Sequence, residues 1–143
     1  MIMENNRHTK EKMNELAAVL RTSFRSFKRE MSVFIGDKLT NNEYSVLKLL
    51  SSPDVKTVTE ISRELGVSVS HITNLTDSLV KKELIMRQRS ATDRRIVQIS
   101  LTEKGAKLTN ELKKKNAQFL YEKFGQLTPE ELNTFIELFK KIQ

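Results

Sequence analysis

A short polar run carries hydroxyl, imidazole and amide groups that can donate and accept hydrogen bonds. The run comprises Ser68, Ser70, His71, Thr73 and Asn74. A carboxamide such as that of Asn74 can donate and accept side by side, which suits the N6 and N7 atoms of adenine. At the N-terminal end of a helix, these groups would be placed to face base edges in a major groove.

A second chemical feature is the charged run from Arg89 to Arg95, which ends in Asp93-Arg94-Arg95. Arginine is favoured in narrow minor grooves, where the negative potential is enhanced. Between residues 56 and 107 there are ten basic and six acidic side chains, so this segment holds +4 of the chain's net +7. The charge therefore favours a polyanionic partner. The alternative is that these charges only solvate the surface.

Two short helical patterns meet at Gly66 and would position the polar run. Thr57 and Glu60 have the spacing of a capping box, and Gly66 can take the left-handed position that ends a helix. Ser68 can cap the second helix. The expected buried stripe of that helix is Ile72, Leu75, Leu79 and Val80.

Two extended patterns flank the charged run. Ile85 and Arg87 share one side of the first, while Val97, Ile99 and Leu101 alternate with polar residues in the second. Residues 57–102 therefore read as a helix-turn-helix followed by a β-hairpin wing.

These residues resemble the MarR family of winged-helix transcriptional regulators. The resemblance is carried by residues 57–66, by residues 70–79, and most specifically by Asp93-Arg94-Arg95 followed by Leu101-Thr102-Glu103-Lys104-Gly105. It implies that Arg95 enters the minor groove and that Asp93 orients the tip through a salt bridge, with Arg94 as the alternative to Arg95.

The chain departs from the family pattern at two positions. Asn74 stands where the family commonly has arginine or lysine, so an operator sequence cannot be carried over. Glu83 stands where the family often has glycine. If the backbone is left-handed there, a residue with a side chain costs about 1 kcal/mol or more.

Striped helical patterns lie on both sides of this unit. One is expected from about Thr9 to Ile35 and another from Thr102 to about Phe124, and Thr128-Pro129-Glu130-Glu131 opens a last helix after Gly125. We expect one domain over residues 1–143, mainly α with a small β-hairpin wing. Residues 1–36 and 108–143 would be dimerisation helices, since neither end can bury its stripe alone.

Composition excludes several classes of function. The chain has no cysteine and two histidines, which argues against disulfides, thiolate sites and a metal cluster. No apolar run approaches the roughly 18 residues of a membrane span, and no export signal is seen, so we expect the cytoplasm. Since no nucleophile elbow, P-loop or HExxH occurs, we expect neither an enzyme nor a cofactor.

The sequence thus favours a homodimeric regulator, in this family most often a repressor, that reads a pseudo-palindromic duplex. Weak phosphate contacts are expected from Lys82, Arg87, Arg89 and the hydroxyl of Ser68. The resemblance also implies that a small aromatic or anionic effector releases the protein from DNA. Its pocket residues would be Phe24, Phe27, Met31 and Tyr44, although core packing also explains them. The alternative function is a winged-helix module that binds another protein.

Overall fold

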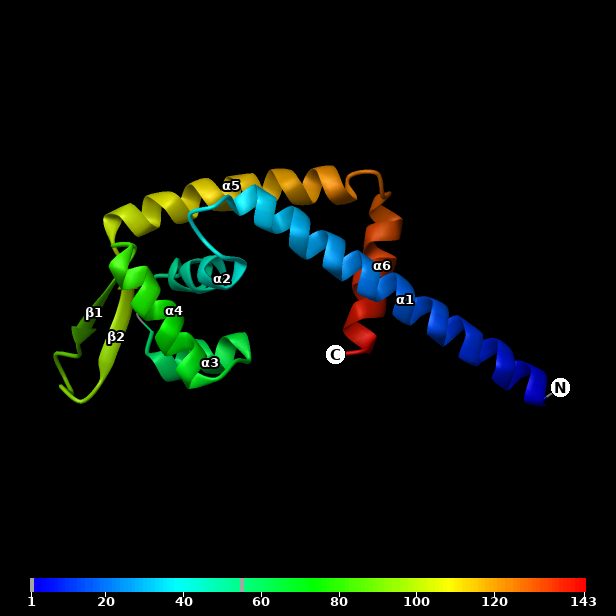
Figure 1. Cartoon of the computed structure of the whole chain (residues 1–143), viewed down its shortest axis with the longest axis horizontal. Helices are drawn as coiled ribbons and strands as arrows, with labels where there is room; N and C mark the ends of the chain where they lie inside the picture. The colour runs from blue at the N-terminus through cyan, green and yellow to red at the C-terminus, as the bar shows by residue number, and fades with distance from the viewer. Residues whose placement is uncertain (1, 55) are drawn as a thin grey trace. The chain divides into compact units, whose positions relative to one another are not determined.

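The computed structural model describes residues 2–54 and 56–143, which form six helices and a two-stranded hairpin (Figure 1). The expected fold class, mainly α with a small hairpin wing, is confirmed. The chain separates into two compact units, one ending at Asn41 and the other running from Asn42 to Gln143. None of the helices in the described ranges combines the length and apolar character that a membrane span requires.

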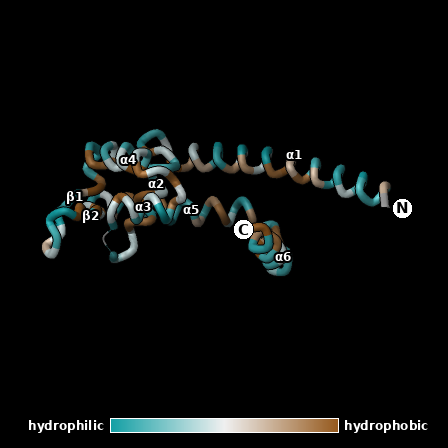
Figure 2. Tube along the Cα trace, turned by 90° about the horizontal axis from the view of Figure 1, so that it is seen from below, coloured by the Kyte–Doolittle hydropathy of each residue, from teal (hydrophilic) through white to brown (hydrophobic). Residues whose placement is uncertain are grey.

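The first unit is dominated by α1 (Ile2–Ile35). The expected start near Thr9 is wrong, because the helix begins at Ile2. Its first turns are held by polar contacts, in which Arg7 pairs with Glu11 at 3.3 Å and Thr9 Oγ1 donates to Asn5 O at 2.8 Å. Such turns carry no apolar periodicity, so the sequence pattern could not show them. Figure 2 shows hydrophilic and hydrophobic residues alternating along this helix.

The second unit contains the expected helix-turn-helix, formed by α3 (Val58–Leu65) and α4 (Val69–Lys81) after α2 (Asn41–Leu50). Both hydrogen bonds of the capping box are present at the start of α3: Glu60 N donates to Thr57 Oγ1 at 3.2 Å, and Thr57 N donates to Glu60 Oε2 at 3.0 Å. Gly66 has φ 65° and ends α3 in the left-handed conformation. The predicted turn is therefore confirmed.

The core of this unit lies between the three helices and the hairpin. Its fully buried aliphatic side chains are Val46, Leu47, Ile61, Ile72, Leu79 and Ile99. The predicted stripe of α4 is right for Ile72 and Leu79, whereas Leu75 and Val80 are only half-buried. Thr76 is fully buried instead. It is tolerated because its hydroxyl donates to Thr73 O at 3.0 Å.

The hairpin pairs β1 (Ile85–Arg89) with β2 (Val97–Leu101) in antiparallel register, with Arg87 opposite Ile99. Ile85 and Ile99 are buried, while Val97 stays exposed. One further residue joins the sheet: Lys56 forms an isolated bridge with Ile99, and their backbone bonds measure 3.2 and 2.7 Å. The base of the wing is therefore tied to the residue that precedes the cap of α3.

The exit of α4 passes through Glu83, which has φ 61°. The Glu83 amide donates to Val80 O at 2.9 Å, and the Leu84 amide donates to Leu79 O at 3.0 Å. These are the two bonds of a Schellman motif, which normally places glycine at the left-handed position. Leu84 and Leu79 are both buried. The backbone at Glu83 is thus left-handed, which is the condition under which its side chain carries an energetic cost.

The same exit is clamped by the start of α5 (Glu103–Phe124). Thr102 Oγ1 donates to Glu83 O at 2.7 Å, and the Thr102 amide donates to Leu84 O at 3.1 Å. A Cβ on Gly105 would lie 1.9 Å from Leu84 O. Glycine in the Leu-Thr-Glu-Lys-Gly run thus permits a close approach that no other residue could make.

The chain ends in α6 (Pro129–Lys141), which starts with the expected capping box at Thr128 and Glu131. Its Phe135 lies 6.3 Å from Phe124 of α5, measured between ring centroids. No residue of α6 is buried. Its large exposed apolar side chains are Phe135, Ile136 and Leu138, followed by Ile142 just after the helix.

Candidate nucleic-acid interface

The N-terminal half of α4 presents a polar face opposite its buried side. Ser68, Ser70, Thr73 and Asn74 are exposed, while Ile72, Thr76 and Leu79 face the core. The side-chain carboxamide of Asn74 makes no hydrogen bond with any residue that the structure describes. It can therefore accept and donate to a ligand without breaking a contact within the chain.

The other polar side chains of this face are partly engaged. Ser68 is the N-cap of α4, and its Oγ accepts from His71 N at 3.2 Å. Thr73 Oγ1 donates to Val69 O at 3.0 Å. His71 is half-buried and lines a small cavity of about 100 Å³ beside Asn42 of α2. The candidate residues thus lie on one end of α4, as the sequence suggested. In the structure Ser68 caps the helix, His71 lines the cavity, and the others lie on the open surface.

The tip of the wing is built around Asp93. Asp93 Oδ1 accepts from Arg95 N at 3.0 Å and from Arg95 Nε at 3.2 Å. The ion pair that the resemblance implied is thus formed, and the side chain of Arg95 remains 92% exposed. The carboxylate fixes both the turn of the backbone and the direction in which Arg95 leaves it.

Two further residues hold this tip. Ser90 is buried, and its Oγ accepts from the amides of Thr92 and Asp93 at 3.3 and 3.4 Å. The guanidinium of Arg89 donates to Arg94 O at 2.8 Å. The sequence did not indicate Ser90, because the run from Arg89 to Arg95 stands out only by its charge. The three-residue spacing from serine to aspartate was the available signal, since it is typical of local serine turns.

Lys82 and Arg87, which the sequence suggested as phosphate contacts, both have partners within the chain. Lys82 Nζ lies 3.0 and 2.8 Å from the carboxylate oxygens of buried Glu43. The guanidinium of Arg87 donates to Thr76 and to Asp77 on α4. Since Arg89 donates to Arg94 O, all three cations expected to contact phosphates have partners within the chain.

The residues suggested for an effector pocket belong to different units. Phe24, Phe27 and Met31 lie on α1 in the first unit, and Tyr44 lies on α2 in the second. Tyr44 is buried, and its hydroxyl has no hydrogen-bond partner among the described residues. Burial also raises the pKa of Tyr44 above that of a free tyrosine.

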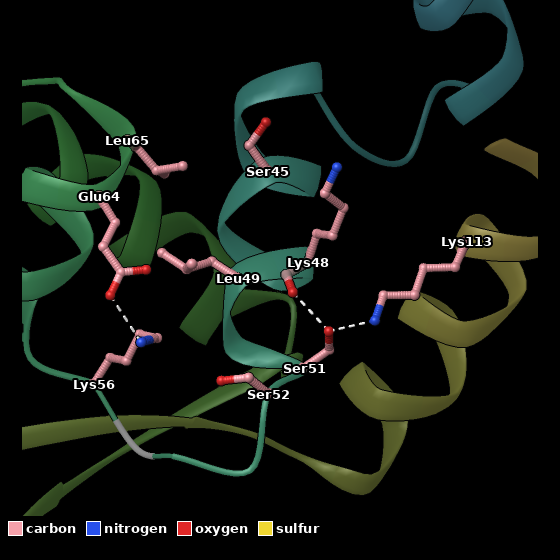
Figure 3. A pocket seen from close by; sticks show the side chains of 9 residues that line it. All are labelled: Ser45, Lys48, Leu49, Ser51, Ser52, Lys56, Glu64, Leu65 and Lys113. Atoms are coloured by element: carbon pink, nitrogen blue, oxygen red, sulfur yellow. Dashed lines mark hydrogen bonds and ion pairs between the residues drawn. The ribbon is translucent and has the colours of Figure 1, made fainter. Parts of the chain in front are cut away.

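A larger cleft of about 560 Å³ lies elsewhere in the second unit, between the end of α2, α3 and α5. Figure 3 shows that two of its cations point to partners: Lys113 contacts Ser51, and Lys56 contacts Glu64. The hydrogen bond to Glu64 raises the pKa of Lys56. Two of the cations that line the cleft thus already have partners, and none of the predicted site residues lines it.

Comparisons with known proteins agree with this geometry. Residues 39–97 match the model of the MarR family. The chain is 40% identical to the HTH-type transcriptional regulator YpoP of Bacillus subtilis, covering 91% of this chain and 92% of that protein. It is 32% identical to the regulator MhqR of the same organism, covering 92% of each.

A solved structure provides the spatial comparison. A mutant MarR from Escherichia coli in complex with operator DNA superposes with a TM-score of 0.79 and 25% identity, covering 89% of this chain and 92% of that one. The mainly helical fold with its antiparallel hairpin thus matches a winged-helix MarR structure over most of both chains. This chain therefore belongs to the MarR family of winged helix-turn-helix transcriptional regulators.

Proposed function

We propose that this regulator binds a double-stranded operator by placing α4 in the major groove and the wing in the minor groove. The observation that carries the proposal is the pairing of two exposed features in one unit. The first is the polar face of α4 with the unengaged amide of Asn74, and the second is the exposed guanidinium of Arg95. The operator complex of the related E. coli MarR supports the same use of the fold.

Within this proposal, base edges are contacted by Ser70, His71, Thr73 and Asn74, while Ser68 caps the helix near the phosphates. Asn74 provides adenine selectivity through paired donor and acceptor contacts. Arg95 enters the minor groove, and Asp93 holds it in the extended direction that insertion needs. Arg94 and Arg89 provide neighbouring positive charge.

The functional form in this proposal is a homodimer built from residues 1–36 and 108–143. Large apolar side chains remain exposed at both ends of the chain. On α1 they include Met13, Leu16, Val19 and Phe24, and at the C-terminal end they include Phe135, Ile136, Leu138 and Ile142. Burying such surface in a symmetric interface stabilises a dimer. Two recognition helices would then read half-sites roughly one helical turn, about 10 bp, apart.

The proposal extends to regulation in the cytoplasm, where DNA-binding repression takes place, and not to catalysis. A small aromatic or anionic effector would release the repressor. Tyr44 is the best anchor for such a ligand, because its buried hydroxyl has no partner among the described residues.

A titration of the duplex upstream of its own gene tests DNA binding. If several phosphates are neutralised, log K should fall steeply and linearly with log salt concentration. A scrambled duplex of equal length is the control for sequence specificity. Binding that is absent, or that ignores salt, would reject the proposal and favour a winged-helix module that contacts another protein. Sedimentation of the free protein at the same salt concentrations tests the dimer separately.

A further inference from the structure

Arg87 connects the wing to the recognition helix. It follows Ile85 by two residues on β1, so the two side chains share one face of the strand. Ile85 is buried, and Arg87 continues the same face out over α4. Its Nη2 atom donates to Thr76 Oγ1 at 2.9 Å and also to Asp77 Oδ1.

One of the two acceptors, Thr76, is held in place by the chain itself. Thr76 is fully buried, and its hydroxyl also donates to Thr73 O at 3.0 Å, so its orientation is fixed. Asp77 lies next to it on α4, one turn beyond the base-reading residues Thr73 and Asn74. A planar guanidinium that serves two neighbouring acceptors fixes a direction as well as a distance, which an isolated ammonium cannot do.

We propose that Arg87 and Asp77 are positioning residues that set the placement of the wing relative to the base-reading face of α4. The proposal rests on DNA binding by this domain. Arg87 then acts mainly through α4 and not through a phosphate. Asp77 raises operator affinity although it carries a negative charge, because it holds the strand that leads to Arg95.

The two possible roles of this pair predict opposite results for one substitution. If simple charge governs binding, Asp77→Asn removes a repulsive carboxylate near DNA and tightens binding at every sequence. If Asp77 positions the wing, the same substitution weakens binding to the operator and hardly changes binding to a scrambled duplex. Asparagine keeps the shape of the side chain, so the helix surface is otherwise preserved.

The experiment measures operator affinity over a range of salt concentrations for Asp77→Asn, Arg87→Gln and the double variant. We expect each single variant to lose roughly tenfold in operator affinity, with the salt slope kept, and the double variant to lose no more than either single one. Arg87 acting on a phosphate instead predicts a slope lower by about 1 in Arg87→Gln and additive losses in the double variant. That result overturns the proposal.

Two controls separate the possible failures. Thermal denaturation establishes that each variant is folded, and if Arg87→Gln is not, Asp77→Asn decides alone by the direction of its effect. If the unchanged protein binds its operator but Asp77→Asn binds equally well or more tightly, only the positioning role is rejected. If the unchanged protein binds no duplex, the proposed function fails and this proposal fails with it.

Discussion

Lys82, the C-cap of α4, places its Nζ 3.0 and 2.8 Å from the two carboxylate oxygens of Glu43 on α2. Ser78 Oγ donates to the same carboxylate at 3.1 Å. Glu43 is only 3% exposed. A buried carboxylate needs charged or polar donors, since its desolvation is otherwise uncompensated. This contact fixes the end of α4 against α2.

Removing the charged donor should therefore lower stability. We expect Lys82→Met to reduce the free energy of unfolding by about 1–3 kcal/mol, because the buried carboxylate loses its cation. Urea denaturation measures the change. The matched control is Lys81→Met, which removes the neighbouring exposed lysine and should have little effect. Equal effects of the two substitutions would contradict the structural role of Lys82.

Glu83→Gly should stabilise the protein. Glu83 sits at φ 61°, where a side chain costs about 1 kcal/mol. Its ion pair with Lys104 is 3.9 Å long and exposed, so losing it matters little. A rise in the melting temperature measures the gain. Glu111→Gly, placed within α5, should instead destabilise by about 1 kcal/mol. A loss of stability in both variants would refute strain at Glu83.

Gly105→Ala should destabilise, against the normal preference of helices for alanine, which is worth about 1 kcal/mol. The added Cβ would meet Leu84 O at 1.9 Å, so α5 must move away from the exit of α4. We expect a net loss of about 1–3 kcal/mol by chemical denaturation. Lys107→Ala, on an exposed position of the same helix, serves as the control. A more stable Gly105→Ala protein would show that the close approach is not required.

Arg95→Ala should weaken operator binding roughly tenfold, which is what loss of one good groove contact costs. Its dimer should stay intact. Arg94→Ala should cost less, because Asp93 directs Arg95 and not Arg94. Fluorescence anisotropy with a labelled operator compares the two with Lys114→Ala, which removes an equal charge from α5. If the order of Arg95 and Arg94 is reversed, Arg94 is the inserted residue.

Tyr44→Phe should leave stability at neutral pH unchanged or raised, because the hydroxyl is buried without a partner among the described residues. Its pKa is raised in the folded protein, so the unfolded chain loses the proton first as pH increases. The unchanged protein should therefore lose stability from about pH 10 upward, near the pKa of an unfolded tyrosine. The variant should lose less. Identical alkaline profiles would show that Tyr44 is solvated.

Local rules account for much of what the sequence could predict. Thr57, Gly66, Ser68, Thr102 and Thr128 each begin or end a helix through backbone contacts that depend only on near neighbours. The left-handed conformation at Glu83 and the ion pair of Asp93 with Arg95 were suggested differently, by the resemblance to the MarR family, and the structure contains both.

Contacts between distant residues could not be read in the same way. Lys82 and Arg87 looked like free surface cations, yet their partners are Glu43, 39 residues away, and Thr76 and Asp77, about ten residues away. Thr76 sits in the core because a threonine hydroxyl can satisfy itself on the helix backbone, so polarity alone misplaces it. A charge pattern in the sequence thus predicts whether a surface is positive or negative. Only the fold shows which charged side chains have no partner within the chain and can contact a ligand.

The bridge between Lys56 and Ile99 has a mechanical consequence. Lys56 precedes Thr57, whose side chain caps α3, and Ile99 lies in the middle of β2. The residue that precedes the cap of α3 and the wing are thus joined by two backbone bonds, which do not depend on the identity of either side chain unless proline removes an N–H. The wing and the start of α3 should therefore move together, with Arg95 at the tip of the wing.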